Sequence, residues 1–89
     1  MIRVAFVVRG RVQGVGYRWF AQQSAASLGI AGFVRNERDG SVAGEAEGEE
    51  DTVAVFVAAL QRGPLHARVD DVATAALPPT GAQGFTVAR

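Results

Sequence analysis

A valine-rich apolar run at residues 2–9 ends at a glycine-bearing loop, Gly10 to Gly16, which leads directly into a helical pattern. A run of this length and composition favours a central strand. The glycines of the loop allow a tight turn with several backbone N–H groups facing inward. The chain therefore starts with a strand, a loop and a helix, and the remaining elements must pack around that unit.

The pattern after the loop predicts a helix that begins near Tyr17, has one narrow apolar face and ends at Gly29. Two strands are predicted at residues 31–36 and 41–47. They are joined across an Asp39-Gly40 pair, which tolerates the positive φ that a hairpin turn requires.

A second helix is predicted over residues 49–61, because its apolar residues again share one face and Gly63 follows it. Residues 67–77 are strand-like, residues 78–81 form a turn, and residues 84–89 can add a short last strand. This order predicts an α+β fold, a ferredoxin-like split βαβ sandwich (β-α-β-β-α-β plus a terminal strand). Both helices are expected on one face of a mainly antiparallel sheet.

The length and composition of the chain limit the number of domains and exclude several kinds of active site. With 89 residues the chain has room for one domain, residues 1–89. The absence of cysteine excludes disulfides, a thiolate nucleophile and a zinc site built on sulfur. All nine basic residues are arginine, so a Schiff-base amine and a P-loop lysine are excluded too.

Charge and the first residues bear on partners and location. Nine basic residues balance nine acidic ones, so no overall field draws in nucleic acid or a membrane surface. The first residues form neither a signal peptide nor a membrane span, so we expect a cytoplasmic protein. We also expect a monomer. Five arginines lie between residues 9 and 38, and an anion site is therefore expected in the first half.

The acidic stretch and one aromatic pair are predicted to have structural roles and not functional ones. The acidic stretch Glu45 to Asp51 is interpreted as a solvated, dipole-favoured helix start, and no metal site is expected there. Trp19 and Phe20 are interpreted as packing residues, because they lack the interleaving with basic residues that an RNA-binding sheet shows.

The loop before the first helix is the first candidate for an anion site. Unpaired N–H groups and the positive end of the helix dipole favour an anion at a helix start. From the loop alone, a strand-to-helix turn without a ligand is an equal alternative. Arg18 favours the anion site, since a cation in the first helical turn is disfavoured unless an anion joins it. The alternative for Arg18 is an exposed side chain lying over the helix.

Asn36 is the second candidate, at the end of a predicted strand and just before the hairpin turn. Taken alone it reads as a turn residue, because asparagine is common in turns. Strand parity supports a functional role instead, since Val34 and Asn36 share a face. If Val34 packs toward the helices, Asn36 points toward the start of the first helix, where its amide can orient a water.

Four segments carry a family resemblance: residues 10–18 (GRVQGVGYR), 32–36 (GFVRN), 39–42 (DGSV) and 84–87 (GFTV). They closely resemble the acylphosphatase family, whose members look like GxVQGVxFR, then GxVxNxxDGxV, then a terminal GFxI or GFxV. The resemblance spans nearly the whole chain. It implies a metal-free hydrolase without cofactor that cleaves the carboxyl–phosphate bond of acyl phosphates, with inorganic phosphate or sulfate as competing anions.

By this resemblance Arg18 corresponds to the phosphate-binding arginine and Asn36 to the asparagine that orients the attacking water. The resemblance also implies a cradle of backbone N–H groups, from Gln13, Gly14, Val15, Gly16, Tyr17 and Arg18. The rival hypothesis is a non-catalytic module of the same fold that binds an anionic small molecule or RNA. A second rival places the site within a larger maturation protein that handles carbamoyl phosphate. We expect no further domain, which argues against this rival.

Overall fold

The structure is a computed structural model that describes residues 1–89, and its elements follow the predicted order. The predicted bounds differ from the observed ones by at most two residues. The strands are β1 (Ile2–Arg11), β2 (Ala31–Asn36), β3 (Val42–Gly48), β4 (Arg68–Leu77) and β5 (Phe85–Val87). The helices are α1 (Tyr17–Leu28) and α2 (Glu50–Arg62).

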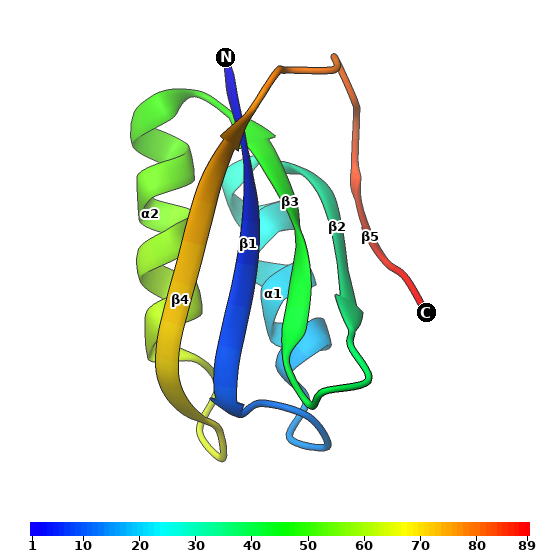
Figure 1. Ribbon diagram of the computed structural model, residues 1–89. Helices are drawn as coiled ribbons and strands as arrows, with labels where there is room; N and C mark the ends of the chain where they lie inside the picture. The colour runs from blue at the N-terminus through cyan, green and yellow to red at the C-terminus, as the bar shows by residue number, and fades with distance from the viewer.

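The five strands form one sheet in the order β4-β1-β3-β2-β5. Neighbouring strands are antiparallel except β2 and β5, which run parallel. Both helices cover the same face of the sheet, and no helix covers the other face (Figure 1). The predicted fold class, a ferredoxin-like split βαβ sandwich with a terminal strand, is therefore confirmed.

β1 is two residues longer than predicted, because Gly10 and Arg11 still pair with β4. The pairing shifts by a bulge between Arg9 and Gly10, which lets the strand continue past the point where the apolar run ends. The loop that leads to α1 therefore begins at Val12 and not at Gly10.

α1 lies close to the sheet because its buried face is built from small residues. Ala21 and Ala25 are fully buried, one helical turn apart. The helix ends at Gly29 in the left-handed conformation, as predicted, and Gly29 and Ile30 donate their N–H groups to the last carbonyls of the helix. Neither α1 nor α2 has the length and apolar character that a membrane-spanning helix needs.

One apolar core fills the space between the helices and the sheet. Phe56 of α2 meets Phe6 of β1 with ring centroids 5.9 Å apart and Phe85 of β5 at 5.7 Å, both in edge-to-face geometry. The largest fully buried side chains are Tyr17, Phe6, Phe56, Leu60, Val8, Val12, Val34 and Val42. Because Phe85 packs against this core, the short β5 is anchored by its side chain as well as by its pairing with β2.

The outer face of the sheet carries a buried ion network. Arg3 of β1 donates to Glu45 at 2.7 Å and to Glu47 at 2.9 Å, both on β3. Glu47 is only 3% exposed and also accepts from the backbone N–H groups of Thr80 and Gly81. The prediction of a solvated acidic stretch is therefore wrong for Glu45 and Glu47. The strand register places Glu47 opposite Arg3, and the chain segment that follows β4 covers both side chains.

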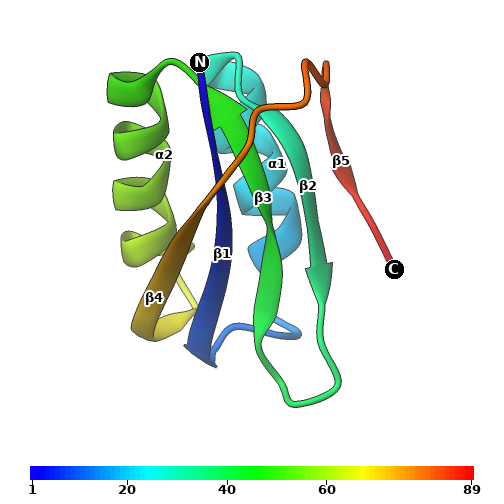
Figure 2. The same cartoon turned by 45° about the horizontal axis from the view of Figure 1, so that its top comes forward.

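That covering segment, residues 78–84, crosses one end of the sheet from β4 at one edge to β5 at the other (Figures 1 and 2). It is longer than the predicted turn at residues 78–81. Through Thr80 and Gly81, the Glu47 carboxylate ties the crossing segment to β3. The tie helps to fix where β5 begins, and β5 ends beside the start of α1.

We expect Glu47→Gln to lower stability at neutral pH and to flatten the loss of stability in acid. Hydrogen bonds from Thr80, then from Arg3 and Gly81, lower the pKa of Glu47 to about 2. A carboxylate with a lowered folded-state pKa stabilises the fold above its unfolded pKa, and this contribution is lost as the pH falls through the folded value. The parent should therefore lose stability between about pH 4.5 and pH 2, and the variant should lose less.

The measurement is urea denaturation of both proteins across that pH range. Glu50→Gln serves as the matched control, because it removes an exposed carboxylate from the first turn of α2 without touching Arg3. Equal stability of Glu47→Gln and the parent at pH 7 would show that the network contributes nothing.

Candidate active site

The loop between β1 and α1 presents a row of backbone N–H groups without protein partners. Gly14 and Gly16 adopt φ angles of 73° and 78°, which residues other than glycine rarely adopt. Gly16 caps α1 without a side-chain hydrogen bond, and the first helical bond runs from Phe20 to Gly16. No backbone hydrogen bond is donated by the N–H groups from Gln13 to Trp19. Unpaired donors at a helix start form a site that suits an anion.

Tyr17 fixes the start of α1 against the second helix. Its hydroxyl donates to the carbonyl of Leu60 on α2 at 2.6 Å, and its ring is almost fully buried. This burial raises the pKa of Tyr17, so the phenol stays protonated. The neighbouring Arg18 therefore extends from a backbone that is anchored on one side by the core.

Gln13 ties the loop to the turn between β2 and β3. Its side-chain amide donates to the carbonyl of Glu37 at 2.7 Å and to that of Ser41 at 2.9 Å. Glu37 directly follows Asn36, so the two bonds hold the loop and the end of β2 together. The sequence implies only a backbone role for Gln13, because its side-chain contact depends on two segments meeting in space.

Asp39 holds the same turn from within. Its carboxylate accepts from the backbone N–H of Ser41 at 2.9 Å and from the Ser41 hydroxyl at 2.6 Å. These bonds, with a smaller contribution from Arg9, lower the pKa of Asp39 to about 2. The turn that Gln13 reaches is therefore a well-bonded one, which makes it a firm anchor for the loop.

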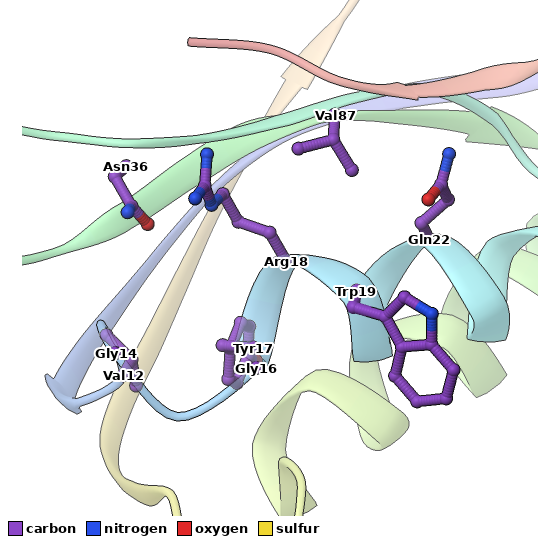
Figure 3. Close-up of a pocket in the computed structure, with 9 residues that line it drawn as sticks. All are labelled: Val12, Gly14, Gly16, Tyr17, Arg18, Trp19, Gln22, Asn36 and Val87. Carbon is purple, nitrogen blue, oxygen red and sulfur yellow. The ribbon is translucent and has the colours of Figure 1, made fainter.

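Arg18 and Asn36, the two predicted site residues, line the same pocket. Arg18 is half-buried, and its guanidinium donates to the carbonyl of Ala88 at 3.4 Å. Asn36 is also half-buried, on the same face of β2 as the fully buried Val34. The two side chains reach toward one another across the pocket (Figure 3). Strand parity therefore predicted the direction of Asn36 correctly.

The pocket has a volume of about 370 Å³ and combines the loop, the start of α1 and the ends of two strands. Its lining is Val12, Gly14, Gly16, Tyr17, Arg18, Trp19, Gln22, Asn36 and Val87. The interpretation of Trp19 as a packing residue is wrong, because its side chain is 66% exposed. Trp19 lies two residues after Tyr17, about 200° around the helix, so it faces away when Tyr17 faces the core.

Nothing in this lining would hold a metal ion. No group of three histidine, aspartate or glutamate side chains in the structure is arranged to bind one. The site offers N–H donors, one guanidinium and the carboxamides of Asn36 and Gln22. Such a set can bind a phosphate and order a water beside it.

Comparisons with known proteins show the family of this chain. The family model described as Acylphosphatase matches residues 4–87. The chain belongs to the acylphosphatase family. The acylphosphatase of Azorhizobium caulinodans is 46% identical over 84 residues, which cover 92% of this chain and 89% of that one. The acylphosphatase of Thermus thermophilus is 44% identical over 87 residues, 98% of this chain and 99% of that one.

Solved structures give the same result. The crystal structure of acylphosphatase from Bacillus subtilis superposes with a TM-score of 0.96 at 36% identity, with all of both chains covered. The structure of T. kodakarensis HypF superposes with a TM-score of 0.86 at 30% identity, but there the chain covers only 12% of that protein. The protein is therefore an enzyme, an acylphosphatase, and not the non-catalytic binding module that the sequence left as an alternative.

We expect Gln13→Ala to lower the catalytic activity of this acylphosphatase without unfolding it. Loss of the two bonds to Glu37 and Ser41 frees the loop from the β2–β3 turn, so the N–H groups and Asn36 lose their fixed spacing. Small misplacements of reacting groups are costly, and kcat/KM should fall roughly 10-fold to 10²-fold. Steady-state kinetics with circular dichroism measure this, with the exposed Gln23→Ala on α1 as the control. Equal rates for the two variants would show that Gln13 does not position the site.

Proposed function

We propose that this pocket hydrolyses acyl phosphates by binding the phosphoryl group in the N–H cradle with Arg18 while Asn36 orients the attacking water. The observation that carries the proposal is the meeting of three different donors in one pocket. They are the unpaired N–H groups of the lining residues Gly14, Gly16 and Tyr17, the Arg18 guanidinium and the Asn36 amide. The oxygens of one phosphate group can accept hydrogen bonds from all three kinds of donor.

The reaction is a displacement at phosphorus. A water oxygen forms a bond to phosphorus, the bond from phosphorus to the carboxyl oxygen breaks, and the carboxylate leaves with the electron pair. In such reactions charge is spread over the equatorial phosphoryl oxygens, and stabilising that charge is the main task of the protein. Fixed N–H donors and a guanidinium provide that stabilisation without reorganising during the reaction.

The leaving group needs little help, because a carboxylate is a weak base and departs without a proton from a general acid. Removal of the water proton is the other requirement. The pocket lining includes neither histidine nor a carboxylate, and the Tyr17 hydroxyl is engaged with Leu60. We assign the proton to a phosphoryl oxygen, which leaves Asn36 the role of aligning the water through hydrogen bonds.

The remaining parts of the proposal concern the setting of the enzyme. We propose a single-domain monomer in the cytoplasm that acts on a small molecule. One core cluster joins both helices to the sheet, which supports a single domain. The equal numbers of basic and acidic residues support a small-molecule partner over nucleic acid. Inorganic phosphate and sulfate should compete with the substrate for the cradle of N–H groups. Analytical ultracentrifugation at the concentration used in the assays tests whether the protein is a monomer.

The test of the proposed function is hydrolysis of benzoyl phosphate by the purified protein, with and without EDTA. Because the proposed groups are N–H donors and a guanidinium, we expect the same turnover under both conditions. Inorganic phosphate should inhibit competitively. Absence of hydrolysis would contradict the proposal, and activity that is lost with EDTA and restored by magnesium or zinc would contradict the metal-free mechanism.

A further inference from the structure

The charged residues are unevenly distributed between the two ends of the sheet, although nine arginines balance nine carboxylates overall. The site end, where β1 leads to α1, contains the pocket of Arg18 and Asn36. β2 and α2 also finish at this end, and β4 begins there, since its Arg68 pairs with Arg11 (Figure 1). The equal totals therefore do not describe the field that a substrate meets near the pocket.

The site end has an excess of positive charge. Its seven arginines are Arg9, Arg11, Arg18, Arg35, Arg38, Arg62 and Arg68. Its four carboxylates are Glu37, Asp39, Asp70 and Asp71. The opposite end has one arginine, Arg3, and five carboxylates, Glu45, Glu47, Glu49, Glu50 and Asp51. The remaining arginine, Arg89, follows β5. The molecule is therefore an electric dipole whose positive end contains the pocket.

Ion pairs leave three arginines of the site end without a neutralising partner. The pairs are formed at 3.1–3.2 Å by Arg9 with Asp39, Arg35 with Glu37 and Arg68 with Asp70. Asp71, opposite Arg9 on β4, is the only carboxylate of this end outside an ion pair. Outside the pocket, Arg11, Arg38 and Arg62 are exposed and form no ion pair. Their charges therefore act on the solvent in front of the site end.

These three arginines come from three different elements around the loop that leads to α1. Arg11 ends β1, directly before the loop. Arg38 lies in the β2–β3 turn, which the Gln13 side chain ties to the loop. Arg62 ends α2, which is bonded to the start of α1 through the Tyr17 hydroxyl. None of the three lines the pocket, so they are placed to act on a substrate through their field and not by contact.

The helix dipole accounts for only one of these positions. Arg62 lies in the last turn of α2, where a cation is favoured by the dipole. Arg11 is in a strand and Arg38 is in a turn, so the dipole explains neither of them. Several like charges around a concave site raise the local concentration of a ligand of opposite charge. The arrangement therefore favours the approach of an anion to the pocket.

We propose that Arg11, Arg38 and Arg62 form a cationic collar that draws anionic substrate toward the pocket and lowers KM without contacting the substrate. This inference rests on the proposed function and adds residues outside the pocket that set the affinity for the phosphoryl group. Salt should weaken the effect, because the three side chains are exposed. The distance over which such charges act falls from about 30 Å at about 0.01 M ionic strength to about 8 Å at about 0.15 M.

The test uses two triple variants of the cationic collar, in which its three arginines are replaced by glutamine or by lysine. At about 0.01 M ionic strength, the glutamine variant should have a KM for benzoyl phosphate about 3-fold to 10-fold above that of the parent. Its kcat should stay within about 2-fold of the parental value, and the rise in KM should shrink to about 2-fold at about 0.15 M. The lysine variant should match the parent, because at this distance the charge acts and not the guanidinium fork.

The matched control removes the same number of charges from the opposite end, in a triple variant with Glu49→Gln, Glu50→Gln and Asp51→Asn. These side chains are exposed at the start of α2. The control should keep KM within about 2-fold of the parental value at both ionic strengths. The dissociation constant of inorganic phosphate, measured by calorimetry, should follow KM in every protein. This readout does not depend on turnover.

The possible outcomes separate this inference from the proposed function. A parental KM for the glutamine variant at low ionic strength would overturn the cationic collar. A rise in KM that is equal at both ionic strengths, or that the lysine variant shares, would also overturn it, since the arginines would then contact the substrate or hold the loop. If the parent does not hydrolyse benzoyl phosphate, the proposed function fails, and the dissociation constants of phosphate decide the inference by themselves.

Discussion

Arg18→Ala is expected to lower kcat/KM for benzoyl phosphate by at least about 10² to 10³, by analogy with the loss of one oxyanion donor. Arg18 supplies the only charged side chain of the pocket lining, while its other donors are neutral. In the proposed mechanism the guanidinium contacts the phosphoryl oxygens both in the bound substrate and in the transition state. We therefore expect a loss of binding together with a loss of turnover, so inorganic phosphate should also inhibit the variant much less.

The conservative variant Arg18→Lys should recover little of this activity. A guanidinium presents a planar fork of donors that matches two phosphate oxygens, whereas an ammonium is a point charge on a flexible stem. Arg18 is also held by its contact with the carbonyl of Ala88 at 3.4 Å, which places the fork in the pocket. Lysine would therefore restore the charge but not the geometry.

The matched control is Arg38→Ala, which removes an exposed arginine from the turn between β2 and β3. It changes the net charge by the same amount at a position outside the pocket lining. If Arg18→Ala keeps the parental inhibition constant for phosphate, or loses no more activity than Arg38→Ala, then Arg18 does not bind the phosphoryl group.

Asn36→Ala is expected to give the second large effect, and of a different kind. The variant keeps the N–H cradle and Arg18, so inorganic phosphate should still inhibit within a few fold of the parent. Turnover should fall steeply, by about 10² or more, because the water is no longer aligned for attack. The separation between binding and turnover distinguishes the role of Asn36 from that of Arg18.

Gln22→Ala is the control for Asn36→Ala, since it removes a carboxamide from the opposite end of the same pocket. Its effect on turnover should be much smaller. Circular dichroism should be unchanged in both variants, because Asn36 and Gln22 are only half-buried. A parental kcat for Asn36→Ala would rule out its proposed role in orienting the water.

Much of the fold could be predicted from the sequence, because the signals that define each element are local. The apolar spacing of α1, the glycine at its end and the Asp39-Gly40 turn each act within a few residues of the chain. The same holds for strand parity, which placed Asn36 on the side of Val34. These local rules are sufficient to predict that the loop, Arg18 and Asn36 lie close together.

The features that the sequence did not predict depend on which strands become neighbours. The ion network of Arg3 and Glu47 needs the pairing of β1 with β3, 44 residues apart in the chain. The contacts of Gln13 likewise need the loop to meet the β2–β3 turn. Trp19 is a different case, because its position relative to Tyr17 already signalled an outward direction.

In the proposed mechanism the backbone N–H groups at the start of α1, with Arg18, bind the phosphoryl group. Titration of the ¹⁵N-labelled protein with inorganic phosphate, followed amide by amide in NMR spectra, tests this binding mode. We expect the largest saturable shifts at the amides from Gln13 to Trp19, and we expect them to be lost in Arg18→Ala. Saturable shifts centred elsewhere, for example around the exposed Arg9 and Arg38, with the loop amides unchanged, would contradict it.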